Sequence, residues 1–156
     1  VMNLKGAIGD LSDGDINIKV EKGVVYVDIS DKLLFKSGSF SITDKATVVL
    51  GKVAKVLAAQ PNIEFMVEGH TDSKQLLGSD NKMEDNWDLS VKRATTIVRL
   101  LQEKYGIDPK RMTAAGRGEY VPVVENNSAE NRAANRRTRI VILPQLDQFF
   151  KLLETK

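Results

Sequence analysis

Two charged residues, Asp72 and Arg93, have the types and spacing to act together on one small ligand. Asp72 ends the segment VEGHTD, in which the apolar residues of a predicted strand give way to small and polar side chains. Arg93 lies on an amphipathic helix predicted from Asn86 to about Lys104. In a strand–loop–helix unit, groups beyond the end of the strand and near the start of the helix converge on one crevice. The pattern therefore predicts a carboxylate and a guanidinium within reach of the same ligand.

A simpler role for the pair is that Asp72 caps a turn or binds Arg93 directly. Surface ion pairs of this kind are common and contribute about 0–1 kcal/mol. At about 100° per residue, Asn86 and Arg93 lie roughly 20° apart, on one edge of the apolar stripe of their helix. Arg93 is therefore expected at the border between core and solvent, where a guanidinium is only partly hydrated.

Other chemistries find little support in the sequence. His70 is the only histidine and there are no cysteines, which rules out thiolate metal sites, disulfides and thiol catalysis. We predict that His70 is a hydrogen-bonded structural residue at the strand end. The acidic residues of 80–88 lack the glycine and the terminal glutamate of a calcium loop, so we expect a solvated face there. The sequence thus predicts no enzyme, no metal and no cofactor.

Apolar spacing along the chain predicts strands that alternate with helices. An N-terminal β-hairpin is expected within 16–29, followed by a Ser/Gly loop at 33–42. The later elements are a helix at 43–59, a strand at 63–69, a helix at 86–104, an extended segment at 112–118, a short helix at 128–135 and a strand at 137–143. The predicted fold class is α/β, a βαβαβ-type two-layer sandwich with helices packed on a mixed parallel and antiparallel sheet.

Composition predicts one globular domain with a segment at each end. Of the 156 residues, 42% are hydrophobic and 28% charged, and the net charge of +2 does not indicate a nucleic-acid partner. The domain is expected at 15–143, after an upstream helix end or linker at 1–14. Residues 144–156 follow the pattern of a C-terminal amphipathic helix, which either packs on the domain or forms a dimer or partner surface.

Three motifs occur in order and in the expected elements: GHTD at 69–72, NWDLSVKRA at 86–94 and NRR at 135–137. Together they resemble the OmpA-like C-terminal domain shared with Pal lipoproteins and MotB-type flagellar stator proteins, over roughly residues 24–143. The resemblance implies non-catalytic, noncovalent binding of peptidoglycan through the diaminopimelate of its stem peptide. It also implies a periplasmic, cell-envelope location and a membrane anchor of the parent protein outside this chain.

The resemblance implies roles for individual residues of this chain. Asp72 would take the ammonium of diaminopimelate and Arg93 its carboxylate, while Asn86 would either hydrogen-bond the ligand or brace the loop. Of Arg136 and Arg137, one would line the site and the other would support it, and the sequence leaves open which. The full set of implied ligand-binding residues is Asp72, Arg93, Asn86, Thr71, Arg136 and Arg137.

The chemistry of the implied ligand agrees with these residue types. The free end of diaminopimelate carries an ammonium and a carboxylate on one carbon, so its host needs an anion and a cation a few ångströms apart. Arginine offers a carboxylate two parallel N–H donors, where lysine offers a point charge. We further expect Asp72 and Arg93 to neutralise each other in the empty site, held apart by a rigid strand end and helix.

Two departures from the family pattern keep a second function open. The loop between Asp72 and Arg93 is longer than the commonest spacing, which resembles the MotB-type branch. Lys36 and Gly38 stand where many relatives carry an acidic residue and an asparagine, so Ser37 and Gly38 are predicted as an altered pocket wall. The alternative function is an assembly or stator-type interaction module with a degenerate pocket. RNA binding through residues 131–139 is the weakest hypothesis, because no aromatic residues alternate with the arginines.

Overall fold

The computed structural model describes residues 16–36, 39–74, 83–143 and 153. Within these ranges, one mixed sheet has the strand order β1-β2-β5-β3-β4. The strands are β1 (Ile16–Glu21), β2 (Val24–Ser30), β3 (Phe65–His70), β4 (Met112–Gly116) and β5 (Arg137–Ile142). Only the β3–β4 pairing is parallel, and the other three pairings are antiparallel. The predicted α/β class, mixed sheet and N-terminal hairpin are therefore confirmed.

Side-chain caps mark where α3, α4 and α5 begin. The helices are α2 (Asp31–Leu34), α3 (Asp44–Ala58), α4 (Asn86–Glu103) and α5 (Ala129–Asn135), with a 3₁₀ turn η1 (Pro109–Arg111) before β4. Thr43 and Ser128 accept hydrogen bonds from the backbone of α3 and α5, and Asp85 does the same for α4. The short helix α2 replaces the start of the predicted Ser/Gly loop. Its single turn is too short to show helical periodicity in the sequence.

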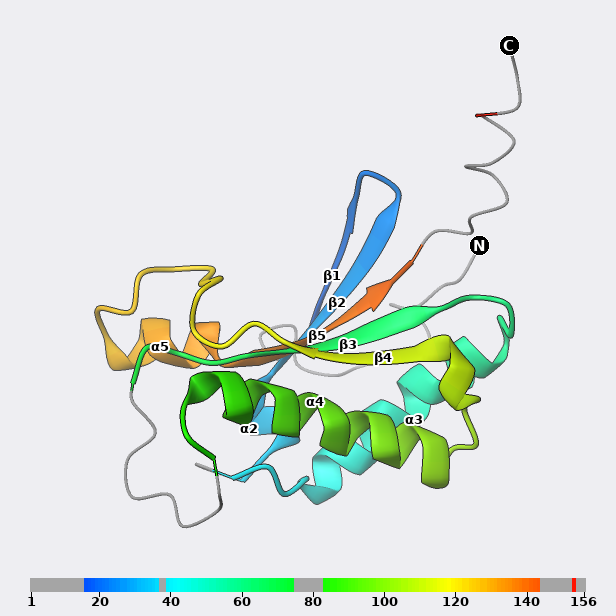
Figure 1. Ribbon diagram of the computed structural model, residues 1–156, viewed down its shortest axis with the longest axis horizontal. Helices are drawn as coiled ribbons and strands as arrows, with labels where there is room; N and C mark the ends of the chain where they lie inside the picture. Colours follow the sequence, from blue (N-terminus) through cyan, green and yellow to red (C-terminus); the bar gives the residue numbers. More distant parts are fainter. Residues whose placement is uncertain (1–15, 37–38, 75–82, 144–152, 154–156) are drawn as a thin grey trace.

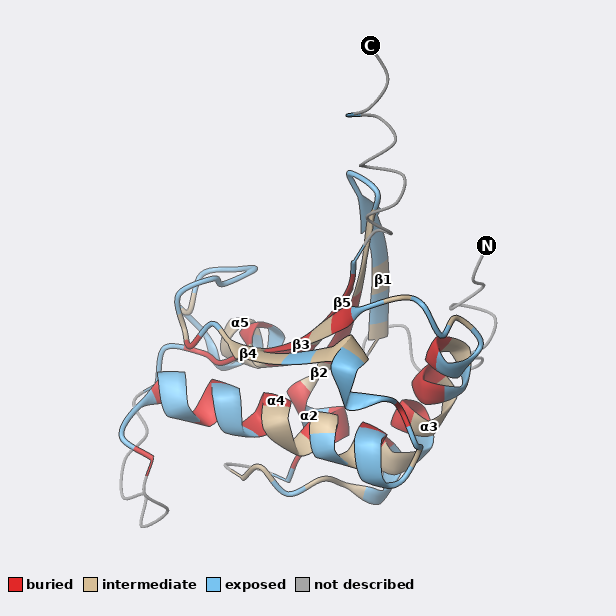
Figure 2. Ribbon diagram, turned by 45° about the vertical axis from the view of Figure 1, so that its right-hand side comes forward, coloured by how far each residue is buried: buried red, intermediate tan, exposed pale blue. Residues whose placement is uncertain are grey.

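Helices α3 and α4 cover one face of the sheet, as Figure 1 shows, and the hydrophobic core lies between them and the strands. In Figure 2 the buried residues of α3 and α4 lie on the sides of these helices that face the sheet. Along β2 and β5, Val27, Ile29 and Ile140 are fully buried in the core. Asp28 and Arg139 alternate with them, so they point to the opposite face of the sheet. Polar side chains can therefore gather on the face that α3 and α4 leave uncovered.

The register of the sheet brings three strand ends together. Ser30 at the end of β2 pairs with Arg137 at the start of β5, and Arg137 also pairs with His70 at the end of β3. The next residue outward on each strand therefore reaches the same edge of the sheet. Consistent with this, the backbone N–H of Asp31 donates to the carbonyl of Arg136 at 2.9 Å. Residues at this edge, among them Asp31, Thr71 and Arg136, line a cavity.

Several sequence predictions lie outside the described residues. These are the segment 1–14, the C-terminal helix at 144–156 apart from Leu153, and the proposed pocket-wall residues Ser37 and Gly38. In the part of the chain that the structure describes, none of the helices has the length and apolar character needed to cross a membrane.

Candidate ligand-binding site

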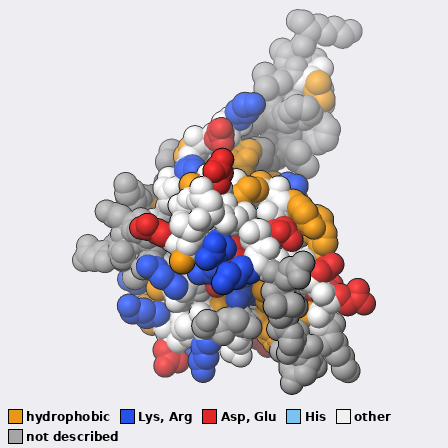
Figure 3. Space-filling model, turned by 90° about the vertical axis from the view of Figure 1, so that its left-hand side faces the viewer, with side chains coloured by type: hydrophobic (Ala, Val, Ile, Leu, Met, Phe, Trp, Pro, Cys, Tyr) orange, Lys and Arg blue, Asp and Glu red, His pale blue; other side chains and the backbone are white. Residues whose placement is uncertain are grey.

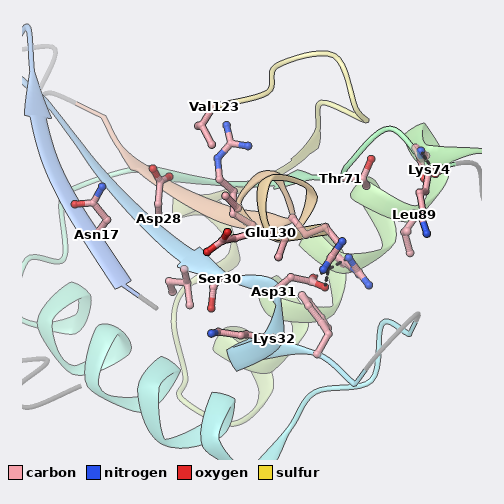
Figure 4. A pocket seen from close by; sticks show the side chains of 18 of the residues that line it. Asn17, Asp28, Ser30, Asp31, Lys32, Thr71, Lys74, Leu89, Val123 and Glu130 are labelled. Atoms are coloured by element: carbon pink, nitrogen blue, oxygen red, sulfur yellow. Dashed lines mark hydrogen bonds and ion pairs between the residues drawn. The ribbon is translucent and has the colours of Figure 1, made fainter. Parts of the chain in front are cut away.

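A cavity of about 940 Å³ opens at the edge where the three strand ends meet. Figure 3 views this end of the molecule and shows Lys and Arg side chains near its centre, with Asp and Glu around them. Figure 4 shows the cavity from close by. Five of the six predicted site residues line it, namely Thr71, Asn86, Arg93, Arg136 and Arg137. The sixth, Asp72, is not part of the lining but contacts Arg136, which is.

Arg93 is held in the cavity wall from three sides. Its Nη1 lies 2.7 Å from Oδ1 of Asp31, and its Nε donates to the carbonyl of Ser39 at 3.1 Å. The guanidinium carbon lies 5.1 Å from the centre of the Phe35 ring. The residue is 3% exposed, yet Nη1 has no hydrogen bond of acceptable direction, because the contact with Asp31 is close but poorly aligned. Nη1 of Arg93 is therefore buried against Asp31 in an ion pair that lacks the alignment of a hydrogen bond.

Asp72 does not pair with Arg93, which corrects the expectation that the two neutralise each other. Its Oδ2 lies 2.5 Å from Nη1 of Arg136, and its Oδ1 accepts from the backbone of Lys74 at 3.0 Å. Arg136 Nε in turn lies 4.0 Å from Oδ2 of Asp31. The charges thus form a chain from Asp72 through Arg136 and Asp31 to Arg93. Two carboxylates and two guanidiniums keep this cluster neutral overall.

Burial sets the protonation behaviour of this cluster. Desolvation raises the pKa of Asp31, although Arg93 and Arg136 oppose the rise. Desolvation also lowers the pKa of Arg93, against the favourable charge of Asp31. In both cases the loss of water outweighs the partner charge. These charged groups are incompletely solvated in the empty site, so an additional polar ligand would have unsatisfied charge to bind.

Asn86 and Thr71 hold the loop that follows β3. The side-chain amide of Asn86 donates to the carbonyls of Lys74 at 2.9 Å and Asp72 at 3.3 Å. The backbone N–H of Thr71 donates to the carbonyl of Gly118 at 2.8 Å, and its hydroxyl donates to the Asp72 carbonyl at 2.9 Å. Of the two roles implied for Asn86, the structure shows bracing of the loop.

The two arginines of the NRR motif differ in their partners. Arg136 forms the ion pair with Asp72 and keeps 36% of its side chain exposed. Arg137 is 5% exposed and donates to the carbonyls of Asn135 at 3.1 Å and Val121 at 3.0 Å. Both line the cavity.

Two further polar residues near the site, His70 and Arg139, have side-chain partners. His70 is buried with its Nε2 2.6 Å from Oε1 of Glu68, as expected for a structural histidine. Arg139 binds Asp28 through two nitrogens, at 2.7 and 3.1 Å. The arginines at 136 and 139 are thus engaged by acids, which favours ion pairing over phosphate binding for this cluster. Lys36, whose type departs from the family pattern, is exposed and does not line the cavity.

Sequence reasoning missed Asp31. Its signal was an acidic residue two positions after the predicted strand at 24–29, just as Asp72 lies two positions after the end of β3. Only the strand order shows that the two strands end at one edge, with the start of β5 between them.

Comparison with known proteins agrees with this architecture. The model of the OmpA family matches residues 34–136. The chain belongs to the OmpA family. The resemblance inferred from the GHTD, NWDLSVKRA and NRR motifs is therefore confirmed. The prediction that the chain is not an enzyme is also supported, because the matched members are motility and outer-membrane proteins.

The match to this chain covers only part of the length of each relative. Motility protein B of Bacillus subtilis is 33% identical over 130 residues, which is 83% of this chain and 49% of that protein. Outer membrane porin F of Pseudomonas aeruginosa is 34% identical over 114 residues, 73% of this chain and 30% of the porin. The chain therefore spans about half or less of the length of these relatives.

Solved structures of the OmpA family share the fold of this chain. A putative MotB-like protein from Desulfovibrio vulgaris superposes with a TM-score of 0.79 at 29% identity, over 89% of this chain and 83% of that one. The cell wall anchor of the T6SS from Pseudomonas aeruginosa has a TM-score of 0.79 at 31% identity, over 92% of this chain and 99% of that one.

Proposed function

We propose that this OmpA-family domain binds peptidoglycan noncovalently, without catalysis, through the zwitterionic end of the diaminopimelate in its stem peptide. The observation that carries the proposal is the state of Arg93. This arginine is 3% exposed in a cavity wall, and its contact with Asp31 is an ion pair without the alignment of a hydrogen bond. A ligand carboxylate in the cavity would add a hydrogen-bond acceptor for this guanidinium, and charge-assisted hydrogen bonds of that kind are among the stronger ones.

The carboxylate of Asp72 is the proposed acceptor for the ligand ammonium. In the empty site this carboxylate is bound by Arg136, whose side chain is 36% exposed against 10% for Asp72. Because the Arg136 side chain is partly exposed, moving it away from Asp72 costs little free energy. A ligand ammonium can then take its place beside Asp72. Since the cluster is neutral and the ligand end is a zwitterion, binding leaves the site neutral. This balance supports an amino-acid head group over a simple anion or cation.

The relatives support a cell-wall partner for the domain. A structure with 31% identity to this chain is described as a cell wall anchor, and the chain covers 99% of it. By this likeness we propose that the domain acts in the periplasm and attaches a cell-envelope protein to the wall. The same proposal includes a membrane anchor of the parent protein outside this chain and a homodimer of the domain.

Binding to purified sacculi tests the proposal. Wild-type protein should sediment with sacculi, whereas Asp72→Ala and Arg93→Ala should remain in the supernatant while keeping a wild-type circular dichroism spectrum. Arg99→Ala is the matched control, since Arg99 is exposed on the same helix as Arg93 and should leave sedimentation unchanged. If wild-type protein stayed in the supernatant as well, the alternative of an interaction module with a degenerate pocket would hold.

A further inference from the structure

The cavity continues well beyond the charged cluster. Figure 4 shows it reaching from Thr71 and Asp31 at the strand ends to Asp28 and Asn17 on the hairpin. Asp28 precedes Asp31 by three positions, and a strand rises about 3.3 Å per residue, so this far part lies roughly 10 Å from the cluster. The head group of one amino acid cannot fill both parts. We call the far part the second lobe, lined by Asn17, Lys19, Asp28, Glu130, Ala134 and Arg137.

The second lobe lies on the face of the sheet that α3 and α4 do not cover. Asp28 of β2 alternates with the core residues Val27 and Ile29, and Asn17 of β1 is its register partner. Helix α5 contributes Glu130 and Ala134 to its wall. The lobe is therefore a continuation of the site between the sheet and α5.

Arg137 is a buried cation in this lobe that has only neutral partners. It is 5% exposed, and its two Nη atoms donate to backbone carbonyls. Its Nε donates to no acceptor in the described part of the chain. The acid that acts on it most strongly, Asp28, already accepts hydrogen bonds from Nε and Nη2 of Arg139. A buried guanidinium without a carboxylate partner is costly, and an incoming carboxylate would relieve that cost.

Resting on the proposed function, we propose that the second lobe binds a second carboxylate of the same stem peptide, with Arg137 as the cation that receives it. The γ-linked glutamyl residue that precedes diaminopimelate carries such a group, its free α-carboxylate. The diaminopimelate side chain and the γ-linkage together are long enough to span the distance from the charged cluster to the second lobe. Lys19 adds positive charge to the lobe, while Glu130 is an acid in its lining that the ligand carboxylate must avoid.

Calorimetric titration of the full chain with three probes tests this inference. The probes are meso-diaminopimelate alone, γ-D-glutamyl-meso-diaminopimelate, and the same dipeptide with its α-carboxylate amidated. We expect the dipeptide acid to bind about tenfold more tightly than its amide, because a charged hydrogen bond is lost on amidation. Equal affinities for acid and amide, with diaminopimelate alone still bound, would overturn the inference. If no probe bound, the proposed function would fail and this inference with it.

A pair of substitutions at Ala134 adds a test on the protein side that does not disturb the core. Ala134 is exposed on α5 and lines the lobe, so Glu and Gln are tolerated there. Ala134→Glu should abolish the preference for the acid by charge repulsion, while Ala134→Gln, of the same size, should keep it. Arg137→Gln should also abolish the preference, and a wild-type circular dichroism spectrum would show that the variant is folded. A preference that survived Ala134→Glu would contradict the placement of the carboxylate.

Discussion

Arg93 is paired with Asp31 and not with Asp72, at 2.7 Å between Nη1 and Oδ1. The two residues come from α4 and from the first turn after β2, which are far apart in the sequence. Asp72 in turn holds Arg136. The carboxylate and the guanidinium proposed to bind one ligand therefore each have a separate partner, which keeps them apart in the empty site.

Loss of the forked guanidinium should weaken ligand binding even when the charge is kept. For Arg93→Lys we expect about 10- to 100-fold lower affinity for a diaminopimelate-containing stem peptide, because lysine cannot offer two parallel donors and would leave the carbonyl of Ser39 unbound. Titration calorimetry measures the effect. Arg99→Lys, the same change at an exposed position of α4, should leave affinity unchanged. Wild-type affinity in Arg93→Lys would contradict the role given to Arg93.

The close approach of α4 to the sheet should be sensitive to one methyl group. A Cβ on Gly69 would collide with the backbone carbonyl of Ser90, which cannot rotate away as a side chain would. We expect Gly69→Ala to lower the free energy of unfolding by about 1–3 kcal/mol and to weaken ligand binding, since α4 carries Arg93. Urea denaturation gives the first value.

Gly51→Ala provides the comparison for that substitution. On α3, the added methyl group meets the tip of the Tyr105 side chain, at 3.0 Å from its hydroxyl oxygen, and not the backbone. Because alanine also favours the helix, the free energy of unfolding should change little or rise. A Gly69→Ala variant as stable as Gly51→Ala would show that α4 can move away from β3 without cost.

Asn135 should contribute to stability through the loop that it holds. It is fully buried, its Oδ1 accepts from the backbones of Val123 and Val124, and its Nδ2 donates to the carbonyl of Val124. Asn135→Ala is expected to cost about 2 kcal/mol, because these backbone groups lose their partners. Asn131→Ala, on the same helix, removes only an exposed side-chain contact with Asn127 and should stay within about 0.5 kcal/mol of wild type. Equal unfolding midpoints for the two variants would contradict this.

Mild acid should destabilise the fold through His70. Burial lowers the pKa of His70 from its ordinary value of 6.5. The charges of Arg137 and Arg139 lower this pKa further, whereas the hydrogen bond with Glu68 raises it. Below pH 6.5 the unfolded chain therefore binds more protons than the folded one, and stability falls as the pH drops from about 6.5 toward the lower pKa of the folded state.

Thermal unfolding at several pH values checks the sign of that effect. The Tm of the wild type should be lower at about pH 5 than at about pH 7.5. In His70→Gln, which keeps a donor for Glu68, the Tm should change less over the same range. Parallel curves for the two proteins would show that other groups are responsible.

Local pattern was enough to predict the elements that carry the site. The apolar stripe of α4 predicted a helix from Asn86, and the structure begins the helix there with Asp85 as its cap. Thr43 and Ser128, the first residues of the helices predicted at 43–59 and 128–135, are the caps of α3 and α5. These features depend on contacts within a few residues, which a single sequence displays directly. The four-residue helix α2 was missed because one turn has no period to detect.

The ion-pair partners were decided by the tertiary structure. The sequence determined that a carboxylate follows β3 and that a guanidinium lies on the inner edge of α4. It could not show that β5 lies between β2 and β3, which brings Asp31 to Arg93 and Arg136 to Asp72. Strand order is set by the burial of whole faces across distant segments, and no local pattern encodes it. For that reason the types of charge in this site were predictable, whereas their pairing was not.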